Sequence, residues 1–437
     1  MKIKLFIFFI IFQGKIIFAL SEQPKNVILI TVDALRPDHL GCYGYKRNTS
    51  PNIDYLAKEG VLFTQAISQV PYTAGSFAAT FTSTYPKQHK VIGLNEKLEL
   101  DNLTLAEILR EKGFVTKAIT TNFILSNAFG FNQGFEPQEF KEYEGKDETE
   151  VAINWLKENI DKRMFLWVHY MEPHAPYEPL PEHNVFLNFI NSKGELPIVE
   201  NEQGEGGIPK YVVRNNRRDL DYYIALYDGE IRTADAKIGR LLEGLKELKL
   251  IDDSLIIFLS DHGEELGEHG FYFSHGTLLY DSSVRVPLII KYKNFEKGKI
   301  IDSQVRLLDI SPTILDILGI KIPRLMKGKS LVPLITGKKN NFNLIAYSYM
   351  IGKFAIRWRG WKLIYNYNKP NLKFELYNLN TDPSEKNNLA KSSPYFLSLK
   401  RKMFIERDRV LPKKMPPPSK IEDEYIIERM KSLGYSN

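Results

Sequence analysis

The chain has 437 residues and a formal net charge of +6, from 59 Lys and Arg against 53 Asp and Glu. Hydrophobic residues make up 43% of it and aromatic residues 12%, so a sizeable core can form; disorder, collagen and coiled coil are excluded for the whole chain. The single cysteine, Cys42, excludes an intrachain disulfide and a cysteine-based metal cluster. No dense Lys/Arg block with interleaved aromatics is present, which predicts no nucleic-acid partner.

The first 21 residues have the pattern of a secretory signal peptide. A basic start at Lys2 and Lys4 precedes an unbroken apolar run over 5–12, and small residues suited to cleavage stand within 19–21. Removal of 1–21 takes away three lysines and no acid, which lowers the net charge from +6 to +3. We therefore expect a secreted or periplasmic protein. The alternative is a retained membrane anchor, with the body of the protein still outside the cytoplasm.

Three apolar runs each end at a residue that can do chemistry. They are 26–32 before Asp33, 164–168 before His169, and 254–259 before Ser260, Asp261 and His262. Continuous apolar runs predict central parallel strands, whose carboxyl ends gather at one edge of a sheet. Stretches with helical periodicity, 103–112 and 219–248, lie between them. The prediction is an α/β fold with a mostly parallel central sheet and helices on both faces.

Two later regions depart from this alternation. Residues 180–218 are polar, rich in Gly and Asn and without periodicity, which predicts a long surface insertion near the site. After about Pro323, aromatic-rich alternating runs at 354–358, 361–367 and 374–377 predict a small antiparallel sheet, and 413–420 is predicted to be a tail. The predicted domains are a signal peptide (1–21), a catalytic domain (22–325) and a C-terminal α+β subdomain with its tail (326–437).

Histidines and acids gather in one part of the chain. All eight histidines lie between His39 and His275, and 260–270 combines acids, imidazoles and glycines at the end of a predicted strand. A carboxylate beside an imidazole offers two metal ligands, and glycine lets the backbone approach a metal or an oxyanion closely. Alone, an Asp-His-Gly run such as 261–263 is more often a solvated or capping loop than a metal site.

A longer series of motifs resembles the sulfatase branch of the alkaline phosphatase superfamily. The series opens with NVILITVDALRPDHLGCYGY over 26–45 and TSPNID over 49–54. The other motifs follow in the family's order: Tyr85-Pro86 with His89, HYMEPHAPY at 169–177, YDGEI at 227–231 with Asp235, SDHG at 260–263, Tyr280-Asp281 with RVPL at 285–288, DISPT at 309–313, and ELYNL at 375–379 with Asp382-Pro383 and Asn388. The resemblance covers 26 to about 390. It implies an alkaline phosphatase/sulfatase-like fold and a metal-dependent hydrolase of ester bonds.

The chain departs from this family at the nucleophile. Sulfatases carry Cys or Ser in a C/S-x-P-x-R signature, and that residue is oxidised to formylglycine. The matching stretch here is TAGSF at 73–77, where Thr73 replaces the modifiable residue. Cys42 lies far outside the signature, so no formylglycine is expected. The acid that ends the first strand is followed by Ala34 rather than a second Asp, and TTN at 120–122 stands where the family has a lysine.

What remains resembles the phosphoryl-transfer members of the superfamily, in which threonine is the nucleophile. The resemblance implies one metal site made of Asp33, Thr73, Asp261 and His262. A divalent cation lowers the pKa of a threonine hydroxyl and screens the phosphoryl oxygens that it attacks. The histidine favours zinc or manganese; calcium, which suits the all-oxygen site of sulfatases, is the alternative.

Further polar residues are expected near the substrate. By the same resemblance, His174 and His275 bind substrate or a second metal, and we expect one of them to assist the leaving group or the incoming water. Asn122 is the expected donor to a non-bridging oxygen of the ester. His89 is the other candidate for substrate contact. For His89, as for His169, a satisfied packing histidine is an equal alternative.

The metal ligand and the nucleophile each have an alternative. Asp33 stands where it could cap the next helix, although its place in the long motif favours metal ligation. Thr73 could be an N-cap, and this role is compatible with that of a nucleophile because a helix N-terminus favours the attacked anion. Ser76 is the rival nucleophile.

Other candidates are open between a structural and a functional role. Arg36, Asp38 and Arg285 fit structural ion pairs as well as substrate contacts. His269 is a weaker candidate for the site. Cys42 is expected to be a small buried hydrophobe.

The leading hypothesis is an exported, metal-dependent, sulfatase-like ester hydrolase that acts through Thr73 on phosphate or sulfate esters, with phosphoryl chemistry favoured. The expected substrate is an ester of a small molecule, a glycan or a lipid headgroup, and membrane proximity is left open. Formylglycine chemistry is not available, because a threonine sulfate has no hydroxyl on the same carbon from which to expel sulfate. The alternatives are a sulfuric ester hydrolase in the strict sense, a phosphoethanolamine-type phosphotransferase, and an inactive relative that binds a glycan, a lipid headgroup or a protein.

Overall fold

The computed structural model describes residues 23–93, 96–136, 146–190, 194–367 and 369–412. The predicted signal peptide at 1–21 and the predicted tail at 413–420 lie outside these residues. None of the helices in the described ranges combines the length and the apolar character needed to cross a membrane.

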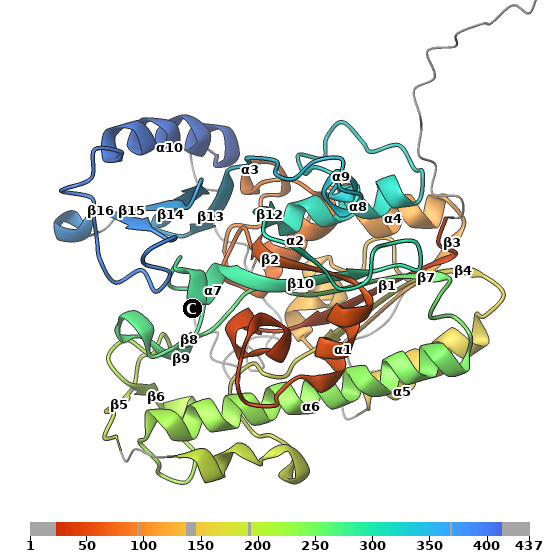
Figure 1. The fold of residues 1–437 in the computed structure, drawn as a ribbon, viewed down its shortest axis with the longest axis horizontal. Coiled ribbons are helices and arrows are strands. Elements are labelled where there is room, and N and C mark those ends of the chain that lie inside the picture. The colour runs from red at the N-terminus through yellow and green to blue at the C-terminus, as the bar shows by residue number, and fades with distance from the viewer. Residues whose placement is uncertain (1–22, 94–95, 137–145, 191–193, 368, 413–437) are drawn as a thin grey trace, which may run out of the picture.

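An eight-stranded sheet forms the centre of the molecule (Figure 1). Its main path has the order β11 (Lys299–Ile301), β2 (Val61–Ile67), β10 (Arg285–Lys291), β7 (Ser254–Ser260), β1 (Asn26–Val32), β4 (Arg163–Tyr170) and β3 (Phe114–Thr120), and β12 (Val305–Arg306) also pairs with β2. Strands β3, β4, β1 and β7 are parallel, β10 is antiparallel to both of its neighbours, and β11 and β12 run parallel to β2. The predicted mostly parallel α/β fold is confirmed.

Alternate side chains of the buried strands pack into two separate layers of helices. In β1, Val27 and Leu29 belong to one core and Ile28 and Ile30 to the other, as the two-residue period of a strand requires. One face of the sheet is covered by α2 (Thr73–Thr82), α4 (Leu105–Glu111), α8 (Ile310–Ile317) and α9 (Val332–Ile335), and the other by α1 (Pro51–Glu59), α5 (Glu148–Glu158) and α6 (Leu220–Glu247) (Figure 1). Because both faces are buried, the strands are continuous apolar runs in the sequence.

The two predicted helices form close to their predicted bounds. The stretch 219–248 is α6, and 103–112 contains α4. Thr104 caps α4, because its Oγ1 accepts from the backbone N–H of Glu107 at 3.2 Å while the carboxylate of Glu107 accepts from the N–H of Thr104 at 2.8 Å. This reciprocal cap, together with the apolar periodicity, explains why the local sequence predicts helix α4.

The segment 180–218, which the sequence predicts to be a long surface insertion near the site, has local secondary structure in its described residues. It contains short 3-10 turns and two two-residue strands, β5 (Ile198–Val199) and β6 (Ile208–Pro209). β6 contacts β9 (Tyr272–Ser274), which pairs with β8 (Glu265–Leu266) in the chain that follows β7. Ile208 is fully buried, and such anchoring contacts order a segment that has no periodicity of its own. The insertion therefore lies beside the loop at the end of β7.

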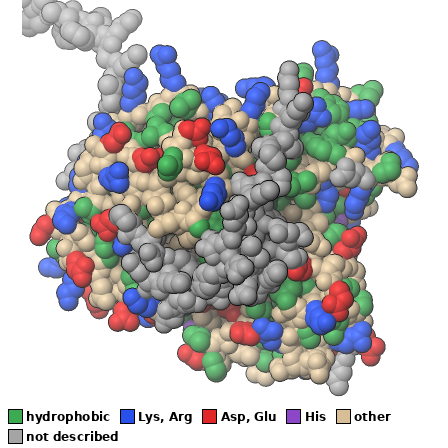
Figure 2. Space-filling model, turned by 180° about the vertical axis from the view of Figure 1, so that it is seen from behind, with side chains coloured by type: hydrophobic (Ala, Val, Ile, Leu, Met, Phe, Trp, Pro, Cys, Tyr) green, Lys and Arg blue, Asp and Glu red, His purple; other side chains and the backbone are tan. Residues whose placement is uncertain are grey.

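A four-stranded antiparallel sheet forms the C-terminal part, as the aromatic-rich runs predict. Its strands, in order, are β13 (Ala346–Met350), β14 (Lys353–Trp358), β15 (Trp361–Asn366) and β16 (Phe374–Asn378). The strand β13 lies outside the three runs that the sequence predicts. The buried Leu399 and Met403 of α10 (Phe396–Val410) pack against this sheet. Figure 2, a view from behind, shows apolar side chains gathered at this end of the molecule. The domain boundary at 325 stays a prediction.

Buried ion pairs join the C-terminal sheet to the rest of the chain. The side chain of Lys362, on β15, is 1% exposed, and its Nζ lies 2.9 Å from Oδ1 of Asp281 and 2.9 Å from Oε1 of Glu385. Asp281 begins α7 (Asp281–Val284), which leads directly into β10. Such a cluster is stable only while each buried charge keeps its partner.

We expect Lys362→Met to lower the free energy of unfolding by about 3 kcal/mol or more, because Glu385 would stay buried without its cation. Urea unfolding followed by tryptophan fluorescence measures the change. The matched control is Lys210→Met, which removes the lysine of an exposed pair with Glu200 and should cost less than about 0.5 kcal/mol. Equal effects of the two substitutions would contradict the anchoring role of Lys362.

Candidate active site

The register of two strands brings two acids to one edge of the sheet. β1 and β7 are parallel neighbours, and Val32 pairs with Ser260. Asp33 and Asp261 directly follow these two residues, so both leave the sheet at the same level of its carboxyl edge. His262 is the next residue after Asp261.

Asp33, Asp261 and His262 form a cluster, called the acid–imidazole cluster below, that fits a metal ion. One ligand atom from each lies within 4.8 Å of the others, and all three side chains are fully buried. Among the described residues, Oδ1 of Asp33 and Oδ2 of Asp261 have no hydrogen-bond partner. Nδ1 of His262 lies 2.8 Å from the carbonyl oxygen of Gly263, which can only accept, so Nδ1 carries the proton and Nε2 keeps its lone pair. The three free ligand atoms suit a divalent cation.

The charges in this cluster need a cation for balance. Burial and the neighbouring charge of Asp33 raise the pKa of Asp261 to about 7. Burial opposes the ionisation of Asp33, but His174, His169 and His262 outweigh it and lower the pKa of this carboxyl. Two carboxylates this close repel each other, so positive charge between them favours the state in which both are ionised. The cluster therefore selects for a cation.

Two donors orient the Asp33 carboxylate. Nδ2 of Asn122 donates to its Oδ2 at 2.8 Å, and Nε2 of His169 lies 3.3 Å from the same oxygen. The hydroxyl of Thr31 lies 2.9 Å from Nδ1 of His169 and so holds the ring in place. Asn122 thus binds a carboxylate of the cluster, and its predicted contact with substrate stays a prediction. His169, whose role the sequence leaves open, contacts the cluster directly.

Thr73 is the first residue of α2 and lies next to the cluster. Its Oγ1 is 3.3 Å from Nε2 of His262, and the helix N-terminus adds partial positive charge there. The hydroxyl of Ser76 is engaged elsewhere, because it donates to the backbone carbonyl of Asp261 at 2.7 Å and accepts from Ser68 at 3.1 Å. The geometry therefore favours Thr73 over Ser76 as the candidate nucleophile.

Two further histidines lie beside the cluster. The ring centroids of His262 and His275 are 4.3 Å apart, and those of His275 and His174 are 4.8 Å apart. Nδ1 of His275 lies 3.3 Å from Oε1 of Glu264, whose Oε2 accepts from the hydroxyl of Tyr177 at 3.3 Å. Burial and the neighbouring His174 lower the pKa of His275 to about 3, and burial raises the pKa of Glu264 to about 8. Glu264 is a site residue that the sequence alone does not indicate. Its position directly after the Asp-His-Gly run is the feature that could have suggested a place in the site.

His89 is not joined to these residues. It ends α3 (Pro86–His89), is fully buried, and its Nδ1 accepts from the backbone N–H of Val91 at 3.1 Å. Its Nε2 has no hydrogen-bond partner in the part of the chain that the structure describes. Burial lowers the pKa of His89 to about 3, so the ring is neutral. His89 is therefore buried apart from the cluster, and its predicted contact with substrate stays a prediction.

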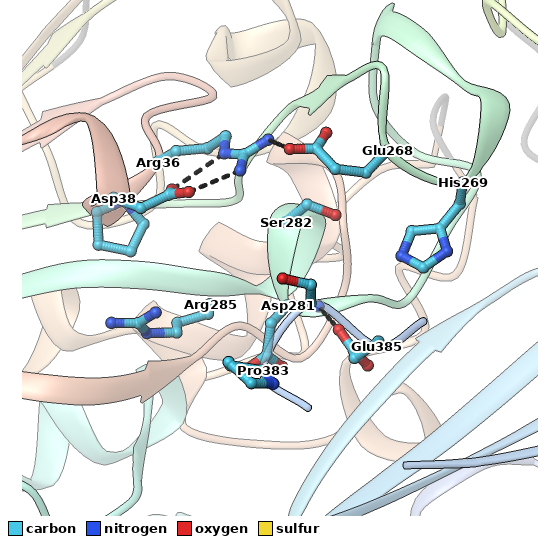
Figure 3. A pocket seen from close by; sticks show the side chains of 11 residues that line it. Arg36, Asp38, Glu268, His269, Asp281, Ser282, Arg285, Pro383 and Glu385 are labelled. Atoms are coloured by element: carbon cyan, nitrogen blue, oxygen red, sulfur yellow. Dashed lines mark hydrogen bonds and ion pairs between the residues drawn. The ribbon is translucent and has the colours of Figure 1, made fainter. Parts of the chain in front are cut away.

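Arg36 and Asp38 form the structural ion pair that the sequence offers as one alternative. Figure 3 shows the guanidinium of Arg36 between the carboxylates of Asp38 and Glu268, at 2.7 Å and 2.8 Å. They line a small polar cavity of about 160 Å³. Arg285 lines the same cavity, and its Nε donates to the backbone carbonyl of Thr64 at 3.0 Å.

Two weaker candidates have local structural roles. The ring of His269 stacks on Tyr280 with centroids 3.5 Å apart, on the wall of the cavity in Figure 3. Cys42 is half-buried against the core beneath α1, and burial with the nearby Asp54 raises the pKa of its thiol. A raised pKa makes a thiol unreactive, in line with the expected packing role.

Two family models match the chain. The model of the sulfatase family matches residues 25–320, and the model described as N-sulphoglucosamine sulphohydrolase, C-terminal, matches 267–407. The first match runs along the chain from β1 to α8 and includes every residue of the acid–imidazole cluster.

Individual proteins agree with the family models. An arylsulfatase of Clostridium perfringens is 26% identical over 85% of this chain and 91% of the relative. An N-acetylglucosamine-6-O-sulfatase of Bacteroides thetaiotaomicron is 23% identical over 88% of this chain and 86% of the relative. The solved phosphonate monoester hydrolase of Agrobacterium radiobacter has a TM-score of 0.72 at 23% identity, over 91% of this chain and 100% of that chain.

The family assignment rests on the span of the match. The sulfatase model covers well over half of the 437 residues, and the solved structure shares the fold over nearly its whole length. Sulfatases and phosphonate monoester hydrolases both hydrolyse ester bonds. The chain is therefore an ester-hydrolysing enzyme that belongs to the sulfatase family of the alkaline phosphatase superfamily.

Proposed function

We propose that this chain is a metal-dependent ester hydrolase with Thr73 as its nucleophile and phosphate esters as its favoured substrates. The observation that carries the proposal is the placement of the Thr73 hydroxyl, 3.3 Å from Nε2 of His262 at the start of α2. Formylglycine cannot form at this position, because Cβ of threonine carries a methyl group and its oxidation does not give an aldehyde. The hydroxyl itself is then the available nucleophile.

Asp33, Asp261 and His262 would hold the cation. Two carboxylate oxygens and an imidazole nitrogen suit zinc or manganese better than calcium, which prefers a larger all-oxygen set. Once bound, such a cation supplies positive charge that lowers the pKa of a neighbouring hydroxyl and screens phosphoryl oxygens. Asn122 and His169 support this role by turning one oxygen of Asp33 toward the cluster.

The chemistry of the chain's own residues follows in two steps. The ionised oxygen of Thr73 forms a bond to phosphorus, the ester P–O bond breaks, and the leaving oxygen takes a proton from protonated His174. Water then attacks the threonine phosphate, gives a proton back to His174 and releases phosphate from Thr73. His275 stays neutral because its pKa is about 3. With Glu264 donating to Nδ1, the neutral ring of His275 carries its proton on Nε2 and would donate it in a hydrogen bond to a phosphoryl oxygen.

Sulfate esters are the second candidate substrates, because the two similar proteins described above are sulfatases. The arylsulfatase and the N-acetylglucosamine-6-O-sulfatase are each aligned over more than four fifths of this chain. The same nucleophile and cation serve a sulfate ester of a small molecule, a glycan or a lipid headgroup. The signal-like pattern at 1–21 supports action outside the cytoplasm.

We expect Thr73→Ala to lower kcat for nitrophenyl phosphate by about a thousandfold or more, because it removes the hydroxyl that lies 3.3 Å from Nε2 of His262. In the unmodified enzyme, acid quenching during turnover followed by mass spectrometry should find phosphate on the peptide that contains Thr73. The matched control is Ser76→Ala, which should keep kcat within about tenfold, since Ser76 bonds only to backbone and Ser68. Loss of activity in Ser76→Ala alone would overturn the assignment.

Zinc affinity should depend on pH in a defined direction. The pKa of Asp261 is raised to about 7 in the cation-free cluster, and only the ionised form binds a cation. The affinity should therefore be constant above about pH 8 and fall by up to about tenfold for each unit below pH 7. Calorimetric titration of zinc into chelator-stripped protein at several pH values measures this. Asp261→Asn should bind weakly with a flatter pH dependence, and a pH-independent affinity of the parent would contradict the cluster as the binding site.

A comparison of three substrates on one zinc-loaded or manganese-loaded sample decides the substrate class. We expect kcat/KM to be highest for a phosphate monoester or diester and lowest for the matched nitrophenyl sulfate, because a threonine sulfate lacks the second hydroxyl that expels sulfate from formylglycine. The Thr73→Ala protein serves as the blank. A higher kcat/KM for the sulfate ester would establish the second candidate instead.

A further inference from the structure

A second cavity lies between the edge of the central sheet and the C-terminal sheet, away from the acid–imidazole cluster. Its volume is about 430 Å³, within the range of about 300–1,000 Å³ typical of small-ligand sites. Its wall includes Gln65, Asp302, Gln304, Asn343, Arg359 and Asn380. β2, which carries Gln65, is three strand positions from β1 in the sheet order, or roughly 14 Å at the usual strand spacing.

The cavity arises from a bulge at the edge of the sheet. Ile301 of β11 pairs with Phe63, and pairing with β2 resumes at Val305 of β12 opposite Ala66. Three residues, 302–304, therefore face two residues of β2, and the longer side must bulge outward. Nε2 of Gln304 fixes the bulge by donating to the backbone carbonyls of Leu344 and Arg357, each at 2.9 Å. The cavity therefore follows from the register of the sheet edge and from the contacts of Gln304.

Side-chain amides dominate the lining. Five of the eleven lining residues are Asn or Gln: Gln65, Gln304, Asn341, Asn343 and Asn380. A primary amide both donates and accepts hydrogen bonds, as does a hydroxyl, whereas a bare phosphate or sulfate ion only accepts. A wall of amides therefore matches a ligand with many hydroxyls better than it matches a simple anion.

The mouth of the cavity carries a strained arginine. Arg359 and Gly360 form the two-residue turn between β14 and β15, with φ of 52° and 76°. Such turns favour Asn or Gly at both positions, so an arginine here is held against its backbone preference. Its Nε donates to Oδ1 of Asn343 at 2.9 Å, and its guanidinium carbon lies 4.6 Å from the centroid of the Trp358 ring. The strain indicates a use for this side chain beyond forming the turn.

The inner wall carries a buried arginine that fixes two of the amides. Arg357 is 9% exposed, and its terminal nitrogens donate to Oε1 of Gln65 at 2.5 Å and to Oε1 of Gln304 at 3.2 Å. Within the described ranges, its Nε has no hydrogen-bond partner. That nitrogen is enclosed by protein and does not face the cavity. The wall is fixed by the two amide contacts and by Oδ2 of Asp281, which lies 3.1 Å from a terminal nitrogen of Arg357.

We propose that this cavity binds a sugar unit of a glycan outside the active site. The amides of Asn343 and Asn380 bond to its hydroxyls, and Arg359 lies over it at the mouth. The inference goes beyond the proposed function and does not depend on the chemistry at Thr73. A second attachment point on the same polymer raises the effective concentration of an ester group at the active site.

The first test uses a printed array of neutral, uronic-acid-containing and sulfated oligosaccharides. The full-length Thr73→Ala protein, which does not turn over esters on the array, should bind a subset of glycans. Adding Asn343→Ala and Asn380→Ala should weaken that binding at least tenfold, while the same two changes in the active enzyme leave kcat for nitrophenyl phosphate unchanged. Both side chains are exposed, and because Asn343 has a φ of 50°, the melting temperature of the doubly changed protein is measured beside its glycan binding. Absence of any glycan signal, or binding that survives both changes, would overturn the proposal.

The second test separates binding from folding at Arg359. Arg359→Asn places a residue that suits positive φ in the turn, so the melting temperature should rise while glycan binding falls at least fivefold. The control Arg324→Asn removes an exposed arginine from outside the cavity and should leave binding as it was. If Arg359→Asn raises the melting temperature and keeps full glycan binding, the proposed sugar site is wrong.

Discussion

The mutual repulsion of two buried carboxylates is the constraint on which the rest of this site depends. Parallel pairing of β1 with β7 fixes Asp33 and Asp261 at one level of the sheet edge, where neither is exposed to water. In that position the pair ionises fully only if positive charge is supplied. The surrounding residues contribute dipoles and imidazoles but no lysine or arginine with an ion pair to these two acids in the described chain. A bound cation is therefore the source of charge that we propose for this site.

The residues near the two acids orient the carboxylates and the imidazole of the acid–imidazole cluster. Asn122 and His169 bind the outer oxygen of Asp33, and the carbonyl of Gly263 fixes the tautomer of His262. The N-terminus of α2 delivers Thr73 to the same point, because the sheet edge and the helix start meet there. A hydroxyl that is ordinarily inert thus lies where added positive charge has its largest effect on the pKa of that hydroxyl.

The C-terminal sheet contributes to the second proposed binding site, which lies outside the active site. It is joined to α7 by buried ion pairs through Lys362, and together with the bulge at 302–304, opposite β2, it forms the amide-lined cavity. A rigid attachment matters here, since a second binding point helps only at a fixed distance from the first.

The amino-acid sequence by itself determined the features that local chemistry controls. Buried parallel strands must be apolar throughout, so β1, β4 and β7 were predictable, and so were the acids and histidines at their ends and the Thr-for-Cys change at 73 that excludes formylglycine. The capped helix α4 was predictable for the same reason.

Only the tertiary structure decided which polar side chains meet. It turned Ser76 toward backbone, joined His169 and Asn122 to Asp33, gave Glu264 a place beside His275, and left His89 apart. It also ordered 180–218, whose few anchoring residues show no period. These outcomes depend on contacts between residues up to hundreds of positions apart, which periodicity and composition do not encode, whereas a strand or a cap depends on its immediate neighbours.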